Sequence, residues 1–321
     1  MLTRSNHMNS FLVSFNAVTP MFLLMLLGYL LRKAHFFDDT FVSRLNKTTF
    51  NIFIPVMIFA DIYQTTLSNV FHVRLTVFSL SVILATCVLA YLVTGIIKME
   101  RKTRGAVIQG VFRGNFALYG LPLIVLICGM KEAASASVLM SIVVPLFNVL
   151  AVIILAIFGE SSASVKNCMH SIFKNPLIIG CAAGLLAQAI HLHLPVSLEQ
   201  CCTWLGDIAI PMCLIILGAS VKTETLHSYI GVITVSSLIR LVIAPALIIA
   251  LAIALRFRGV DLLIITALFS SPTSITSYPM SVEMKINADV TCGMIVLTTI
   301  FSTITVFFFT FIIQYLGFFT I

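Results

Sequence analysis

The amino-acid sequence predicts an all-α integral membrane protein in which ten transmembrane helices form two inverted five-helix repeats. Of its 321 residues, 60% are hydrophobic and only 10% are charged, a balance that excludes an ordinary soluble domain. The apolar residues come in runs of about twenty, the length that crosses a bilayer core. A third observation, the recurrence of prolines at a fixed distance, predicts the two halves.

Ten hydrophobic runs joined by short connections define the expected spans. In order, they cover residues 11–31, 42–62, 71–97, 102–129, 135–158, 172–192, 198–220, 228–256, 261–285 and 290–316. The first run is longer than a signal-peptide core and lacks a small-residue cleavage pattern, so we expect it to be a span. The longest polar break, 159–171, is the expected cytoplasmic linker between one repeat at 11–158 and a second at 172–316.

Lysine and arginine positions predict how the spans are oriented. Most lie in connections after odd-numbered spans, as Arg32, Arg101 and Lys166 do, whereas Arg256 and Arg258 are exceptions. The positive-inside rule therefore places both termini of this multi-pass cell-membrane protein outside the cytoplasm. With five spans per half, the second half enters the membrane inverted. The net charge of +7 forms no continuous basic stripe, so we predict no nucleic-acid partner.

Prolines and glycines recur along the chain and indicate an internal repeat. A constant offset of 156 positions relates Pro20 to Pro176, Gly28 to Gly184, and the segment Asn51–Pro55 to Asp207–Pro211. By the same rule, Pro122 in the fourth span predicts a break near residue 278, and Pro279 lies beside that position.

Two stretches interrupt otherwise apolar spans at matching places in the halves. Arg113–Leu123 combines an arginine, an asparagine, two glycines and a proline, and Ser270–Met280 combines two prolines with several hydroxyl side chains. Backbone freed from a helix within a membrane is tolerated only where protein or a watery cavity satisfies it. Broken spans in corresponding halves are typical of a transporter's binding site. Each break offers a half-helix N-terminus, and two that face each other favour an anion, most simply a carboxylate.

The expected substrate-binding residues come from both breaks. They are Arg113, Gly114, Asn115, Tyr119, Gly120 and Pro122 from the first, and Ser271, Pro272, Thr273, Ser274, Thr276, Tyr278 and Pro279 from the second. The Asn115 amide can donate to a carboxylate while the glycines let the backbone open. Arg113 has three interpretations: it clamps a second carboxylate in bidentate fashion, it pairs with Asp207 or Asp61, or it reaches toward an interface.

Ionisable and polar residues elsewhere in the spans form a second set of candidates. Asp207 and Asp61 are candidates for coupling to a proton or cation, because charge within a membrane is costly and marks function. Arg240 is expected to pair with a carboxylate or with backbone carbonyls. Asn148 either faces the cavity or, as the favoured interpretation, holds helices together. The eight cysteines include no C-x-x-C, and the seven histidines lie outside the spans or near their ends. We therefore predict no metal site, no cofactor and no enzyme such as an intramembrane protease.

At this point the sequence resembles the auxin efflux carrier family, the membrane transport proteins that include plant auxin exporters and bacterial malate and malonate carriers. The resemblance rests on Asn51–Phe59, Gly114 and Asn115 with Gly120–Leu123, Pro145–Asn148, Gly206–Ser220, and Ser271 and Pro272 onward through Asn287–Asp289. The order and spacing of these motifs cover almost the whole chain. The short linker makes it similar to a compact bacterial member.

The resemblance implies an elevator-type carrier with a scaffold domain at 11–62 and 172–220 and a transport domain at 71–158 and 228–316. Substrate would lie where the broken fourth and ninth helices cross. We accordingly predict a secondary active transporter for a mono- or dicarboxylate in the lipid bilayer, forming a homodimer through the scaffold helices. Two alternatives stay open: a sodium- or proton-coupled antiporter on the same fold, and a membrane sensor that transports nothing.

Overall fold

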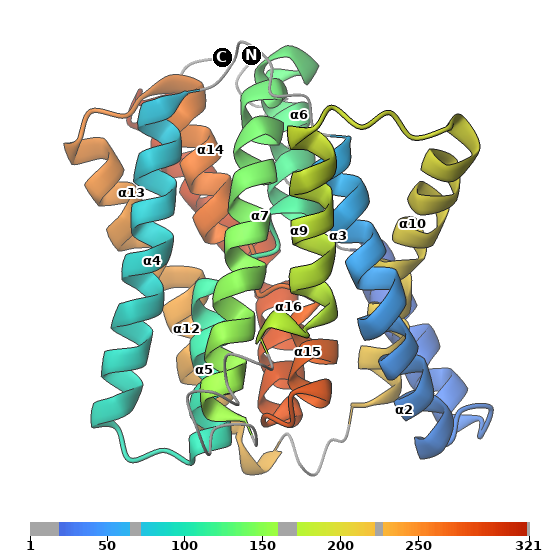
Figure 1. Cartoon of the computed structure of the whole chain (residues 1–321). Helices are drawn as coiled ribbons and strands as arrows, with labels where there is room; N and C mark the ends of the chain where they lie inside the picture. The colour runs from blue at the N-terminus through green and yellow to red at the C-terminus, as the bar shows by residue number, and fades with distance from the viewer. Residues whose placement is uncertain (1–18, 65–71, 160–171, 222–226, 320–321) are drawn as a thin grey trace.

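The computed structural model describes residues 19–64, 72–159, 172–221 and 227–319 (Figure 1). The first part of the expected first span, residues 11–18, and nearly all of the expected linker, residues 160–171, lie outside the described residues. Over the described ranges the chain is all-helical and contains no β-strand.

The helices follow one another through short connections. Residues 19–33 are helical, followed by α2 (Asp39–Thr48), η1 (Thr49–Phe53), α3 (Ile54–Tyr63), α4 (Val73–Ile96), α5 (Arg101–Phe112), η2 (Phe116–Gly120), α6 (Leu121–Cys128), α7 (Met130–Phe158), α9 (Pro176–Ala189), α10 (Val196–Ala219), α12 (Ile230–Leu238), η4 (Ile239–Ile243), α13 (Ala244–Ala254), α14 (Gly259–Ser270), α15 (Ser277–Glu283) and α16 (Ala288–Tyr315). Five helical stretches of the described chain are long and apolar enough to cross a membrane: Val73–Ile96, Ala133–Phe158, Val196–Ala219, Ile230–Ala254 and Ala288–Tyr315.

Capping residues move some helix ends away from the expected span limits. The second helix begins at Asp39 rather than at 42, because the Asp38 side chain accepts a hydrogen bond from the Phe41 N–H at 2.6 Å. The sixth, α9, begins at Pro176 rather than at 172. There the Asn175 side chain caps the helix and proline occupies the first turn, where it needs no hydrogen-bond donor.

Proline also explains where helices widen. Each π-helical turn is followed, after one intervening residue, by a proline: η1 by Pro55, η2 by Pro122 and η4 by Pro245. Because proline lacks an N–H and its ring crowds the preceding turn, the helix relaxes into a wider turn at that place. Two of these wide turns, η2 and η4, lie beside the site described below.

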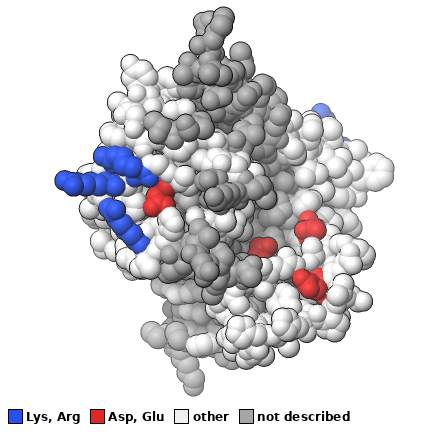
Figure 2. Space-filling view, turned by 90° about the horizontal axis from the view of Figure 1, so that it is seen from above, with Lys and Arg blue, Asp and Glu red and all other residues white. Residues whose placement is uncertain are grey.

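The distribution of side chains is that of a membrane protein. Large apolar side chains are exposed along the outer helices, such as Leu89 and Leu92 on α4 and Ile304 and Phe308 on α16. Two charged side chains, Arg113 and Arg240, are instead buried between helices, together with many hydroxyl and some amide side chains. Among the described residues seen at one end of the bundle, Figure 2 shows a group of basic side chains at one edge and a few acidic side chains elsewhere. An apolar exterior without much charge suits lipid.

Helices pack in two sets. In one, α3 contacts α9 and α10, and the helix at 19–33 meets α10 so closely that a Cβ on Gly28 would lie 2.0 Å from the Ile215 carbonyl oxygen. In the other, α5 contacts α4, α7 and α16, while α14 contacts α13 and α16. Figure 1 shows α10 and α2 at one side of the molecule and α4 and α13 at the other.

Candidate functional site

Two helix breaks face each other in the middle of the bundle. The chain leaves α5 after Phe112 and resumes a helical course at Phe116, and it leaves α14 after Ser270 and resumes at Ser277. Both interruptions lie within the stretches that the sequence singles out. The two segments join through an antiparallel bridge between Gly114 and Thr273.

Backbone groups freed in one break are satisfied largely by the other. The Asn115 N–H donates to the Pro272 carbonyl at 2.8 Å, and the Ser274 N–H donates to the Arg113 carbonyl at 3.1 Å. Thr273 adds a hydroxyl bond of 2.9 Å to the Gly110 carbonyl on α5. Buried backbone without water needs partners of this kind, so the two breaks stabilise one another.

Arg240, carried by the π-helical turn η4, joins the ends of both helices that enter the breaks. Its Nη1 donates to the Val111 carbonyl on α5 at 3.1 Å, and its Nη2 donates to the Ser271 carbonyl after α14 at 2.8 Å. Helix C-termini carry partial negative charge and unsatisfied carbonyls, so one buried guanidinium neutralises two of them. The expectation that Arg240 pairs with backbone carbonyls is confirmed.

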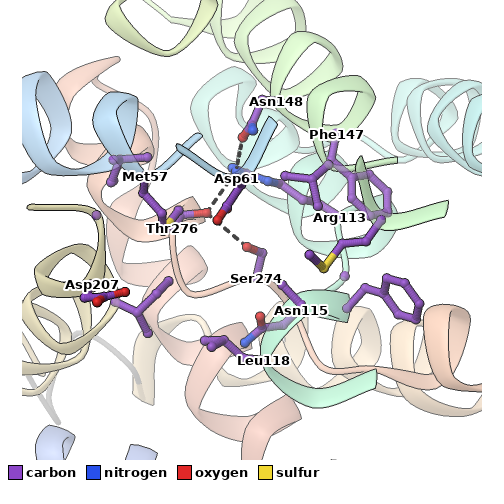
Figure 3. Close-up of a pocket in the computed structure, with 18 of the residues that line it drawn as sticks. Met57, Asp61, Arg113, Asn115, Leu118, Phe147, Asn148, Asp207, Ser274 and Thr276 are labelled. Atoms are coloured by element: carbon purple, nitrogen blue, oxygen red, sulfur yellow. Dashed lines mark hydrogen bonds between the residues drawn. The ribbon is translucent and has the colours of Figure 1, made fainter. Parts of the chain in front are cut away.

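Arg113 is buried, with only 4% of its surface exposed, and its hydrogen-bond partners are neutral. Its Nη2 donates to Asn148 Oδ1 and, at 2.8 Å, to Thr276 Oγ1, and its Nη1 contacts the Met280 sulfur (Figure 3). These partners come from α7 and the second break, and the alternative of a pairing with Asp61 or Asp207 stays a prediction.

A cavity of about 410 Å³ opens beside the two breaks. One wall comes from α3 and α10, a second from α7, and a third from the breaks and η2. Its lining consists of Ile54, Met57, Asp61, Arg113, Gly114, Asn115, Phe116, Ala117, Leu118, Met140, Val144, Phe147, Asn148, Gly206, Asp207, Ile210, Pro211, Ser274 and Thr276. Mostly apolar walls with a few converging polar groups are typical of a small-molecule site.

Asn115 is the group in this cavity that most clearly lacks a partner. Its side chain is 7% exposed, and within the described structure its Nδ2 makes no hydrogen bond. A buried amide without a partner costs about 1–3 kcal/mol, which a bound acceptor would restore. Asn115 lines the cavity in Figure 3, so the missing acceptor is expected on a ligand.

The predicted site residues divide into two groups. Arg113, Gly114, Asn115, Ser274 and Thr276 line the cavity. The remaining residues singled out in the breaks do not: Tyr119, Gly120, Pro122, Ser271, Pro272, Thr273, Tyr278 and Pro279. Those in the second group form the breaks and their packing; Tyr119, for example, is only 1% exposed.

Both predicted coupling residues, Asp61 on α3 and Asp207 on α10, also line the cavity. The wall contributed by α7 supplied none of the expected substrate-binding residues. Asn148, for which helix packing and a position at the cavity were both considered, lines the cavity and accepts from Arg113, and Phe147 and Met140 line the same wall. The Pro145–Asn148 motif was a signal for this wall, since a proline and an asparagine are unusual within a membrane helix.

Irregular backbone and buried charge inside an apolar bundle occur where a membrane protein handles a polar solute. The class that this fold and cavity define is the multi-pass membrane transport protein.

Comparison with known families leads to the same class. The family described as "Membrane transport protein" matches residues 13–170 and 161–310, and the chain therefore belongs to that family. The resemblance to the auxin efflux carriers and their relatives is confirmed. A protein of Methanothermobacter thermautotrophicus described as an uncharacterized transporter is 24% identical over 306 residues, covering 92% of this chain and 97% of the relative.

Proposed function

We propose that this protein is a secondary active carrier for a small carboxylate, which binds in the cavity beside the two breaks. The observation that carries the proposal is the pair Arg113 and Asn115: a guanidinium with neutral partners and an amide with no partner, both lining the cavity. A carboxylate accepts hydrogen bonds from the amide and is attracted by the guanidinium. The N-terminal end of η2 adds a favourable dipole at the same wall.

The carrier works by an elevator-type movement in the cell membrane. Helix 19–33 with α2, α3, α9 and α10 forms the scaffold, through which two copies pair, and the remaining helices form the transport domain with the breaks. Support comes from the packing sets described above and from the position of the cavity between α3 and α10 on one side and the breaks on the other. The two domains derive from inverted repeats at 11–158 and 172–316, with both termini outside the cytoplasm.

Uptake into proteoliposomes tests the carrier function. Purified protein is expected to exchange a labelled small carboxylate against the same compound inside, and Asn115→Ala is expected to lower the affinity for that compound at least tenfold. Asn51→Ala is the matched control, because Asn51 is exposed and bonds only locally to the Lys47 carbonyl. Binding without exchange would favour a sensor, and neither binding nor exchange would refute the proposal.

Movement is tested separately with spin labels on two exposed positions, Trp204 on α10 and Ile304 on α16, after substitution by cysteine in a background without native cysteines. Elevator motion predicts a distance distribution that shifts when a transported carboxylate is added. A distribution that stays unchanged while transport proceeds would contradict it.

Ion coupling is a second candidate, favoured by the two carboxylates of Asp61 and Asp207 at the cavity. This candidate predicts that an imposed proton or sodium gradient drives uptake by the wild-type protein. It also predicts that Asp207→Asn loses this gradient-driven uptake but retains exchange.

A further inference from the structure

The charges around the cavity are separated by structural element. Both carboxylates, Asp61 and Asp207, come from α3 and α10, whereas the guanidinium of Arg113 and the amide of Asn115 come from the first break. In Figure 3 Asp207 lies at one side of the site, Arg113 and Asn115 lie toward the other, and Asp61 lies between them in this view. Asn51, which corresponds to Asp207 in the repeat, does not line the cavity, so the repeat itself provides no structural reason for an acidic group at that place.

A plain carboxylate suits only half of this arrangement. It would bond to Asn115 and approach Arg113, but it would also enter a cavity that already holds two carboxylate side chains. A dicarboxylate would bring a second negative group toward them. Like charges that lie close together repel each other, so a ligand with negative charge alone is disfavoured beside these two carboxylates.

We propose that the substrate is an amino carboxylate, a molecule with a carboxylate at one end and an ammonium group beside it, as in an amino acid. The inference rests on the proposed carrier function. The carboxylate accepts from the Asn115 Nδ2, which is buried without a partner, and faces Arg113. The ammonium, with three N–H donors and no acceptor, faces the carboxylates of Asp61 and Asp207.

The rest of the cavity suits the carbon portion of such a substrate. Apolar side chains from three elements line it, including Met57 on α3, Phe116 and Leu118 on η2, and Met140 and Phe147 on α7. Methionine adapts to differently shaped neighbours, so this wall accepts a small apolar side chain rather than one fixed shape. A volume of about 410 Å³ leaves room for an amino acid with an aliphatic side chain.

Matched pairs of compounds test the inference in proteoliposomes at pH 7. Each pair keeps the carboxylate and changes the nitrogen: alanine against propionate, leucine against 4-methylvalerate, and leucine against N-acetylleucine. The amino acid is expected to compete for exchange at least tenfold better than its partner. Asp207→Asn is expected to lower the affinity for leucine at least tenfold and to leave the affinity for 4-methylvalerate unchanged or higher. Asn115→Ala is expected to lower the affinity for both compounds.

Other outcomes overturn the inference in distinguishable ways. If propionate or 4-methylvalerate exchanges and the amino acids do not, the inference fails and the carboxylate carrier stands. If no compound is bound or exchanged, both fail. If Asp207→Asn abolishes only gradient-driven uptake of plain carboxylates, the acidic residues serve ion coupling and the inference is wrong. Should Asp207→Asn not fold, the selectivity of the wild-type protein for each pair decides the question alone.

Discussion

The contact between Gly114 and Arg240 makes the sharpest prediction about how the two breaks are held. A Cβ added at Gly114 would lie 2.1 Å from Arg240 Nη2 and 2.5 Å from Ser271 Oγ. Gly114 does not have a positive φ, so alanine is opposed by this contact and not by the backbone conformation. Gly114→Ala therefore forces the guanidinium away from the carbonyls that it serves.

The size of the effect follows from the bonds that are lost. Arg240 donates to the Ser271 carbonyl from Nε and Nη2 and to the Val111 carbonyl from Nη1. A buried acceptor left without a donor costs about 1–3 kcal/mol, and overpacking costs about 1–3 kcal/mol as well. Gly114→Ala is therefore expected to destabilise the protein by about 2–6 kcal/mol, depending on how many of these bonds survive.

A melting experiment with a thiol-reactive dye measures the effect in detergent, because Cys87, Cys181, Cys213 and Cys292 are buried and free. Gly231→Ala is the matched control: Gly231 is exposed on α12 and a Cβ there meets nothing within 4 Å, so this change is expected to be neutral or slightly stabilising.

A double-mutant cycle isolates the contact. Arg240→Met alone also destabilises the protein. In the Arg240→Met background, Gly114→Ala should lower stability much less than in the wild type, which gives a coupling energy of about 1–3 kcal/mol. Two results would contradict this contact: a melting temperature of Gly114→Ala equal to that of the Gly231→Ala control, or additive effects of Gly114→Ala and Arg240→Met on stability.

Three further predictions concern the cavity and the packing around it. Asn148→Leu removes one of the two acceptors of Arg113 Nη2 and should lower stability by about 1–3 kcal/mol and reduce transport. Unchanged melting and uptake would show that this bond is unimportant. Gly218→Ala places a Cβ 1.9 Å from the Met25 carbonyl oxygen. Because backbone atoms cannot move aside as a side chain does, this substitution should destabilise the protein by about 1–3 kcal/mol or more. A melting temperature equal to that of the wild type would contradict this close packing. Asn115→Ala removes an amide nitrogen that has no partner and should melt within a few degrees of wild type while binding carboxylates weakly; a large loss of stability would mean that Asn115 is structural.

Much of the architecture could be predicted because proline and glycine are costly in a membrane helix. Pro122 and Pro279 indicated both breaks, and the unusual asparagine at 115 indicated a cavity-lining position. Arg240 was expected to bond to carbonyls for the same reason: a buried guanidinium must find acceptors.

The direction in which individual side chains point could not be predicted in the same way. A membrane helix is apolar on its lipid side and often on its inner side, so the sequence does not reveal how it is rotated. Tyr119 and Tyr278 therefore looked like site residues although neither lines the cavity, and the contact between Arg113 and Asn148, 35 positions apart, had no signal in the spacing. Tertiary packing decides such contacts.

Asn115 and Arg113 are proposed to bind a small carboxylate in the cavity at the paired breaks, from which the protein carries it. The most direct test is exchange of a labelled carboxylate, with and without an amino group, by wild-type, Asn115→Ala and Asn51→Ala proteins in matched proteoliposomes. Saturable exchange is expected, which Asn115→Ala weakens at least tenfold and Asn51→Ala leaves unchanged. Equal exchange in all three proteins would place the substrate elsewhere and rule out this cavity as the binding site.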